Sequence, residues 1–91
     1  MPDWFVYVLR CGDGSLYTGI TTDVSRRLAE HASGGPKAAK YLRGRGPLNL
    51  AFSVGVESKS AALALERWVK GLPKPRKELF AAGRLSWPGQ D

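Results

Sequence analysis

The sequence has one cysteine, no long hydrophobic run and few acidic residues. Cys11 alone cannot form an internal disulfide or a cysteine-rich metal site, which favours a reducing compartment such as the cytoplasm. No apolar run approaches the ~20 residues that a membrane-spanning helix needs. The first residues, Met-Pro-Asp-Trp, lack the basic and apolar regions of a secretory signal. We therefore expect a cytoplasmic protein with no membrane segment.

The shortage of acid is concentrated in two stretches of the chain. Eight Asp and Glu face 14 Lys and Arg, for a net charge of +6. No acidic residue occurs between Glu30 and Glu57 or between Glu66 and Glu78. The basic residues in these windows are Lys37, Lys40, Arg43, Arg45, Arg67, Lys70, Lys74, Arg76 and Lys77. Such windows suit a nucleic-acid backbone, and the alternative is a basic face that only keeps the protein soluble.

With 91 residues, 43% of them hydrophobic, the chain has room for one domain. Apolar and β-branched runs predict strands over 4–11, 15–20 and 48–56. Helical spacing predicts helices after Asp23, after Ser58 or Ser60, and over 75–82. The expected fold is α+β: a three-stranded antiparallel sheet flanked by helices, in the order β-β-α-β-α-α. We expect the domain to span 1–83 and the tail, 84–91, to be loose.

The register of the first hairpin decides whether Tyr7 and Tyr17 meet. A two-residue turn at Asp13 and Gly14 would place the two tyrosines on opposite faces of the sheet. A three-residue loop, with Gly14 left-handed, would pair Tyr7 with Gly19 and place both tyrosines on one face. In that second arrangement Gly19 has no side chain and leaves space for a substrate. Both registers are compatible with the sequence.

Three further residues could act beside the tyrosines. Arg27 and His31 are four residues apart and lie on one flank of the first helix, where an arginine can hold a phosphate and a histidine can move a proton. The simpler interpretation is an exposed arginine and a packed histidine. Glu66 could pair with Lys70 one helical turn on, or it could be the single carboxylate ligand of a Mg²⁺ ion that keeps most of its waters.

As an ordered set, these residues resemble the motif series of the GIY-YIG nucleases. The series is Val6-Tyr7-Val8, Tyr17-Thr18-Gly19, Arg27, His31 and Glu66. The run from Ala39 to Pro47 and the pattern after Glu66 resemble the small stand-alone bacterial branch. That branch is similar to the N-terminal domain of the nuclease component of the bacterial excinuclease and to Slx-type endonucleases. The resemblance covers roughly residues 4–80.

The resemblance implies an endonuclease that uses Mg²⁺ or Mn²⁺ to hydrolyse DNA phosphodiester bonds, with branched or damaged DNA as candidate substrates. Tyr17 or Tyr7 would activate or orient the water, and Arg27 would hold the scissile phosphate. Glu66 would bind the metal, and His31 would relay or accept a proton. The residues expected to contact DNA are Gly19, Lys37, Lys40, Tyr41, Arg43, Arg45, Lys70 and Lys77.

Two departures from the family pattern affect these expectations. The excinuclease branch has a lysine where this chain has Ile20, so the proton acceptor would be His31 or nothing. The late asparagine of many members has no counterpart, since the one asparagine is Asn49. No targeting domain is expected, so cleavage would be weak, non-specific or dependent on a protein partner that supplies specificity.

Two other kinds of function fit the sequence. One is a basic nucleic-acid-binding module of the same fold that does not cleave. The other is a protein-binding adaptor that uses its three tryptophans, Trp4, Trp68 and Trp87, which are more simply explained as core residues.

Overall fold

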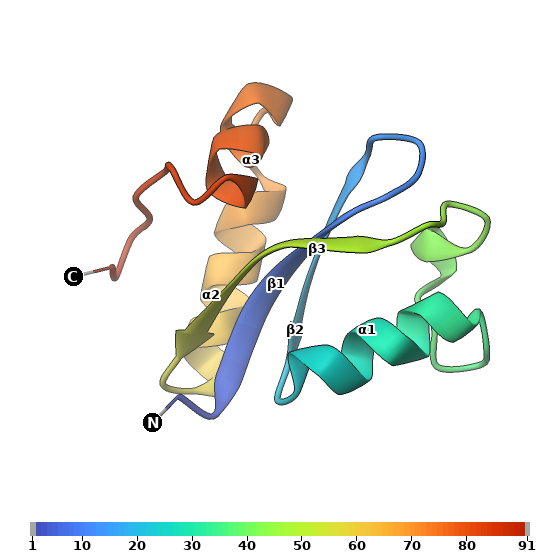
Figure 1. The fold of residues 1–91 in the computed structure, drawn as a ribbon. Coiled ribbons are helices and arrows are strands. Elements are labelled where there is room, and N and C mark those ends of the chain that lie inside the picture. Colours follow the sequence, from blue (N-terminus) through green and yellow to red (C-terminus); the bar gives the residue numbers. More distant parts are fainter. Residues whose placement is uncertain (1, 91) are drawn as a thin grey trace.

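The computed structural model describes residues 2–90, which fold into one sheet and its flanking helices (Figure 1). The antiparallel sheet has the order β2-β1-β3. The strands are β1 (Trp4–Arg10), β2 (Leu16–Thr21) and β3 (Asn49–Val56). The helices are α1 (Val24–Ser33), the 3₁₀ turn η1 (Lys40–Leu42), α2 (Lys59–Lys70) and α3 (Lys74–Ala81). The predicted α+β fold and the order of its elements are confirmed. Within residues 2–90, no helix is both long and apolar enough to cross a membrane.

The hairpin between β1 and β2 has the three-residue loop. Cys11 and Ser15 close it, since the Cys11 N–H donates to the Ser15 carbonyl at 2.9 Å. Gly14 has a φ of 85°, a left-handed conformation that favours glycine. Tyr7 therefore lies opposite Gly19 and Leu9 opposite Tyr17. Side chains alternate along a strand, so the two tyrosines share one face of the sheet.

Each face of the sheet has its own core. Alternate residues of β1, Val6 and Val8, pack with α2 and α3 on one face. The other residues of β1, Tyr7 and Leu9, pack with α1 and the loop around η1 on the opposite face. Figure 1 shows α1 leaving the end of β2, apart from α2 and α3. The second face therefore places the two tyrosines under α1 and its following loop.

Capping residues set where the helices begin. The Asp23 carboxylate accepts the Arg26 N–H at 3.0 Å, and the Ser58 hydroxyl accepts the Ala61 N–H at 3.0 Å. Ser58, and not Ser60, is therefore the cap of α2. Helix α1 ends at Gly34, which has a φ of 69°. This stop comes just after His31 and leaves it in the last turn, facing the sheet.

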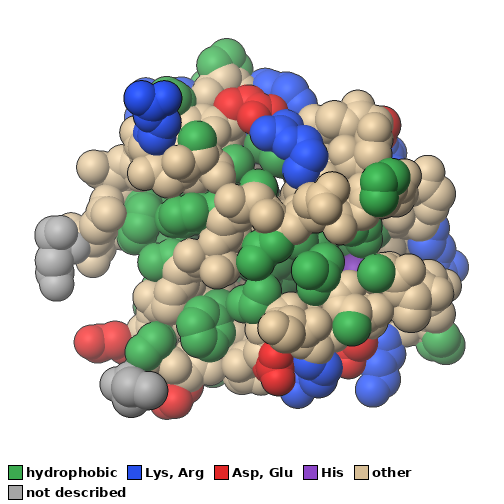
Figure 2. Space-filling model, viewed as in Figure 1, with side chains coloured by type: hydrophobic (Ala, Val, Ile, Leu, Met, Phe, Trp, Pro, Cys, Tyr) green, Lys and Arg blue, Asp and Glu red, His purple; other side chains and the backbone are tan. Residues whose placement is uncertain are grey.

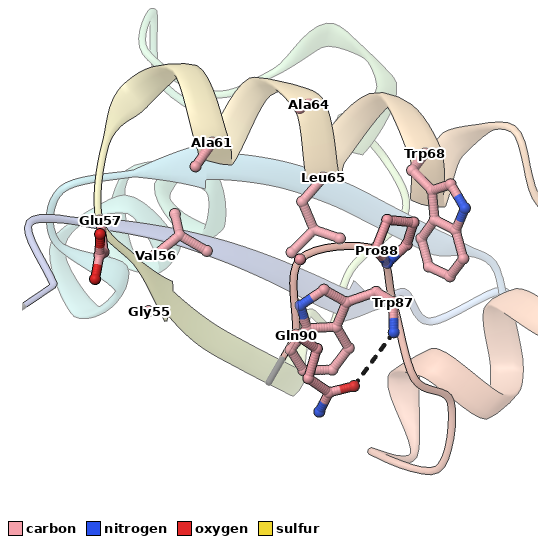
Figure 3. Close-up of a pocket in the computed structure, with 11 residues that line it drawn as sticks. Gly55, Val56, Glu57, Ala61, Ala64, Leu65, Trp68, Trp87, Pro88 and Gln90 are labelled. Carbon is pink, nitrogen blue, oxygen red and sulfur yellow. Dashed lines mark hydrogen bonds between the residues drawn. The ribbon is translucent and has the colours of Figure 1, made fainter.

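The C-terminal segment is packed, which differs from the loose tail expected from the sequence. Leu85 and Trp87 pack against the core under α2 and α3. The Trp87 ring lies edge-on to Phe80, with ring centroids 5.5 Å apart. With Trp68, Trp87 also lines a groove of about 680 Å³ beside α2 (Figure 3). A buried aromatic surface this large favours order over a free tail. Asp91 lies outside the described residues.

Candidate active site

Three aromatic rings converge under α1. The Oη of Tyr7 lies 2.8 Å from Nε2 of His31, and both side chains are buried, with 2% and 3% of their surface exposed. The Tyr17 ring centroid is 6.3 Å from that of Tyr7 and 5.5 Å from that of His31. Strand register and helical spacing, which the sequence shows separately, thus bring these three predicted residues into one cluster. Tyr17 is half-buried and is the more exposed of the two tyrosines on this face of the sheet.

The backbone of the following loop determines which nitrogen of His31 carries the proton. The Ala39 N–H donates to Nδ1 of His31 at 3.2 Å, so Nδ1 must present its lone pair. Burial lowers the pKa of His31, and the nearby charge of Arg27 lowers it further. The neutral ring therefore carries its proton on Nε2 and donates it to Tyr7. In this arrangement His31 is a donor to the tyrosine, and the Tyr7 hydroxyl can donate its own proton elsewhere.

Tyr7 remains a neutral phenol at ordinary pH. Burial raises the pKa of Tyr7 to about 12, and negative charge at Tyr17 and at Glu66 also raises it. The positive charge of Arg27 acts in the opposite direction. These effects place Glu66 and Arg27 within electrostatic range of the Tyr7 hydroxyl. Three of the other four predicted catalytic residues, Tyr17, Arg27 and Glu66, thus influence the pKa of Tyr7.

Gly19 makes room for Tyr7 itself. A Cβ at Gly19 would lie 2.5 Å from Oη and 2.7 Å from Cζ of Tyr7, far inside van der Waals contact. The Tyr7 ring crosses β2 at this point on its way to His31. The space that we expected to admit a substrate is therefore filled by the phenol. The glycine serves the placement of Tyr7.

Arg27 lies at the rim of the cluster, with 27% of its side chain exposed. Its Nη1 donates to the Glu30 carboxylate at 3.0 Å and to the Lys37 carbonyl at 2.7 Å. Both bonds use the same nitrogen, and the guanidinium also acts on the Tyr7 hydroxyl, whose pKa it lowers by its charge and by hydrogen bonding. This arrangement orients the guanidinium and keeps part of its fork available for a phosphate.

Glu66 comes from α2, in the layer on the other face of the sheet. Its carboxylate lies 3.3 Å from Nζ of Lys70, and 20% of its side chain is exposed. The ordinary i,i+4 ion pair is therefore present. No group of three or more His, Cys, Asp or Glu that could hold a metal occurs within residues 2–90. A lone, accessible carboxylate fits a Mg²⁺ or Mn²⁺ ion that keeps most of its waters, and it does not fit zinc.

The predicted DNA-contacting residues fall into separate groups. Tyr41 stacks on Tyr17, with centroids 5.9 Å apart, and Arg45 lies over Tyr41. Lys37, Lys40 and Arg43 are exposed on the same loop. Lys70 and Lys77 lie on α2 and α3, in the other layer. In Figure 2 most Lys and Arg side chains lie toward the edges of this view, and hydrophobic side chains gather between them.

Two contributors to the site were not foreseen. The backbone of Ala39 fixes His31, and no side-chain pattern could reveal a main-chain donor. Asp13 forms an ion pair with Arg45. The Asp-x-Ser pattern at 13–15 indicates that Asp13 is held in a turn, but it does not indicate the partner.

Comparison with known proteins agrees with this geometry. The GIY-YIG catalytic domain family matches residues 3–78. A UPF0213 protein of Cronobacter sakazakii is 52% identical over 87 residues, which is 96% of this chain and 90% of the relative. The solution NMR structure of the UPF0213 protein BH0048 from Bacillus halodurans is 48% identical, with a TM-score of 0.57 over 89% of this chain and 84% of that one. The NMR structure of EF2693 from E. faecalis is 36% identical, with a TM-score of 0.60 over 88% of this chain and 86% of that one.

The fold and the cluster are therefore those of a GIY-YIG-type catalytic domain. The chain belongs to the GIY-YIG family, among its small stand-alone bacterial UPF0213 proteins. Membership indicates a nuclease-like function, with DNA as the kind of substrate and a divalent metal ion as the kind of cofactor that is general in the family.

Proposed function

We propose that this protein is a metal-dependent endonuclease that hydrolyses DNA phosphodiester bonds. The observation that carries the proposal is the buried Tyr7–His31 hydrogen bond beside the half-exposed Tyr17 and the partly free guanidinium of Arg27. A packing cluster would have no need to bury an oriented histidine against a phenol. It would also have no need to aim an arginine at the same place.

Tyr17 is the tyrosine that we assign to the attacking water. Tyr7 is almost fully buried, and its pKa of about 12 keeps it protonated, so it serves poorly as a base. The half-buried Tyr17 side chain would reach a solvent-side nucleophile and orient it. Tyr7 and His31 then support Tyr17 from behind by fixing the position of the rings. His31 holds its Nε2 proton toward Tyr7 and supplies polarity without a positive charge.

Arg27 would bind the scissile phosphate with its guanidinium, while Glu30 and the Lys37 carbonyl hold Nη1. A guanidinium fixed in advance stabilises the charge that develops on the phosphate without reorganising. The exposed cations of the loop, Lys37, Lys40 and Arg43, would contact the DNA backbone on either side of the scissile bond. Lys70 and Lys77 would bind DNA from the second layer.

Glu66 would hold the metal, Mg²⁺ or Mn²⁺, through one carboxylate. When bound, such an ion neutralises the phosphate and the leaving oxygen. The ion pair with Lys70 compensates the charge of the Glu66 carboxylate. Glu66 also gives the cleavage proposal its advantage over a binding module, because a carboxylate beside bound phosphate would only weaken binding.

The proposal extends to the setting in which the enzyme acts. We assign it to the cytoplasm and to DNA repair, with branched or damaged DNA as the substrate. A protein partner would supply the specificity that so small a catalytic domain lacks. These assignments rest on the family resemblance and on the charge pattern.

The test is cleavage of plasmid and of branched oligonucleotides with Mg²⁺ or Mn²⁺ by the wild type, Tyr17→Phe and Glu66→Ala. We expect cleavage by the wild type and a loss of at least ~100-fold in both variants. Equal activity in all three proteins would reveal a contaminant and refute the assignment. Salt-sensitive binding without cleavage in any of them would favour the binding module.

A further inference from the structure

Arg43 and Arg45 are two residues apart in the acid-free loop, and the sequence predicts the same role for both. The structure separates them. Arg43 is exposed and forms no ion pair within residues 2–90. Arg45 is half-buried and is engaged on several sides at once. The difference is large enough to assign the two arginines to different tasks.

Arg45 ties its loop to the turn between β1 and β2. Its Nη1 forms an ion pair with Asp13, and its Nε donates to the Tyr41 carbonyl at 2.7 Å. Its guanidinium lies 4.2 Å from the centroid of the Tyr41 ring. Its own carbonyl accepts the Gly12 N–H at 2.6 Å. The Asp13 carboxylate is itself held by the N–H and hydroxyl of Ser15, at 3.0 and 2.6 Å.

The same loop touches two of the three rings of the active site. Tyr41, held from one side by Arg45, stacks on Tyr17 with the ring planes 28° apart. Ala39, two residues earlier, fixes Nδ1 of His31. A displacement of this loop would therefore have two effects at once. It would release the Tyr17 ring, and it would remove the Ala39 N–H that keeps Nδ1 of His31 unprotonated.

We propose that Arg45 is a positioning residue, which holds the loop against Tyr17 and His31 through Asp13 and Tyr41. It acts on the rate of cleavage and not on the affinity for DNA. Nε and Nη1 of this guanidinium already donate to the Tyr41 carbonyl and to Asp13, and its face lies over the Tyr41 ring. The ion pair is exposed and contributes little stability by itself, so its effect is on geometry. The expected effect on the rate of cleavage rests on the proposed nuclease function, whereas the positioning of the loop does not.

The experiment compares Arg45→Met with the matched control Arg43→Met. Methionine keeps much of the aliphatic length and removes the charge. For Arg45→Met we expect cleavage at saturating DNA to slow roughly tenfold or more, because misplaced catalytic groups lose rate steeply. DNA affinity and its salt dependence should change little. For Arg43→Met we expect the effect on binding that Arg45→Met lacks: a lower affinity for DNA and a salt slope flatter by about 1.

A second measurement does not depend on cleavage. The ¹⁵N chemical shifts of the His31 ring distinguish its two tautomers. We expect the wild type and Arg43→Met to show the Nε2–H form and Arg45→Met to show a mixture. Asp13→Asn removes the carboxylate that holds the Arg45 guanidinium. It should therefore change the ratio of the His31 tautomers in the same direction as Arg45→Met. Asp13→Asn combined with Arg45→Met should be no worse than Arg45→Met alone.

The outcomes separate this inference from the nuclease proposal. If Arg45→Met loses affinity and salt slope but keeps its saturated rate, Arg45 is a phosphate ligand and the inference is wrong. Unchanged His31 shifts in both Arg45→Met and Asp13→Asn also overturn it. If the wild type itself does not cleave, the nuclease proposal fails, while the ¹⁵N shifts still decide whether Arg45 holds the loop.

Discussion

The hydroxyl of Tyr7 and the imidazole of His31 are joined by a buried hydrogen bond in which the histidine is the donor. The histidine thus stabilises the oxygen of the phenol and does not withdraw its proton. Because His31 donates to Tyr7, we expect Tyr7 to contribute to stability and Tyr17 to contribute to activity, although the sequence does not distinguish them. The difference can be measured.

Replacing Tyr7 and Tyr17 by phenylalanine should separate stability from activity. Tyr7→Phe leaves the Nε2–H of His31 without an acceptor in the core, which costs about 1–3 kcal/mol of the free energy of unfolding. Tyr17→Phe keeps the ring and its contacts, and the half-exposed hydroxyl should cost no more than ~0.5 kcal/mol. Denaturant unfolding and cleavage assays check both. A stable but inactive Tyr17→Phe is expected; an active one would contradict the role that we assign to its hydroxyl.

Gly19→Ala tests whether Tyr7 fills the space over β2. The new Cβ would lie 2.5 Å from the phenol oxygen, so the ring must move away from His31. Overpacking of this kind costs about 1–3 kcal/mol, and we expect cleavage to fall with it. Gly71→Ala is the matched control, because a Cβ there meets only ordinary contacts at 3.6 Å. Thermal unfolding and a crystal structure provide the measurement, and an undisturbed Tyr7 in Gly19→Ala would refute the prediction.

His31 should make stability depend on pH just below neutrality. Burial lowers the pKa of His31 in the folded state, whereas the unfolded chain takes up the proton near the ordinary value of about 6.5. The unfolded state therefore binds more protons in this window, and stability falls as the pH falls from about 6.5 toward the folded pKa. Protonation of Nδ1 would also oppose the Ala39 N–H. Unfolding measured as a function of pH should show this slope.

His31→Gln is the control for the pH experiment. Glutamine does not titrate, so the slope below about 6.5 should disappear while the remaining acid sensitivity stays. That sensitivity belongs to carboxylates with lowered pKa values. Arginines lower the pKa of Glu30 and of Glu78, and hydrogen bonds from Ser15 lower the pKa of Asp13 to about 2. Their contribution is lost only at lower pH. A slope that survived in His31→Gln would mean that another group titrates there.

The sequence predicted the fold because its signals were local. Apolar and β-branched runs, Asp23 as a cap, and Ser58 as one of two candidate caps each act within a few neighbours. The hairpin register was narrowed to two choices, and the left-handed Gly14 decides between them. Helical spacing correctly placed Arg27 and His31 on the same flank of α1.

What the sequence did not predict depends on contacts that no local sequence pattern shows. Arg45 meets Asp13, 32 residues away, and Ala39 meets the side chain of His31 through its backbone. The packing of Trp87 on Phe80 likewise needs the third dimension, because a short polar segment with Pro and Gly has the composition of a loose tail. Charge counting treated all the loop cations alike, although Arg45 is engaged by Asp13 and by Tyr41.

Glu66 should be required for the metal and dispensable for DNA binding. Glu66→Gln keeps the shape of the side chain and removes the charge, so cleavage in Mg²⁺ should be lost while DNA affinity without metal stays equal or rises. Loss of the negative charge should also lower the pKa of Tyr7 from about 12, since the charge of Glu66 contributes to raising it. Phenolate absorbance measures that shift. Glu57→Gln, an exposed carboxylate after β3, is the control and should behave as the wild type. If Glu66→Gln cleaved normally, the metal would have to be held by something other than this carboxylate.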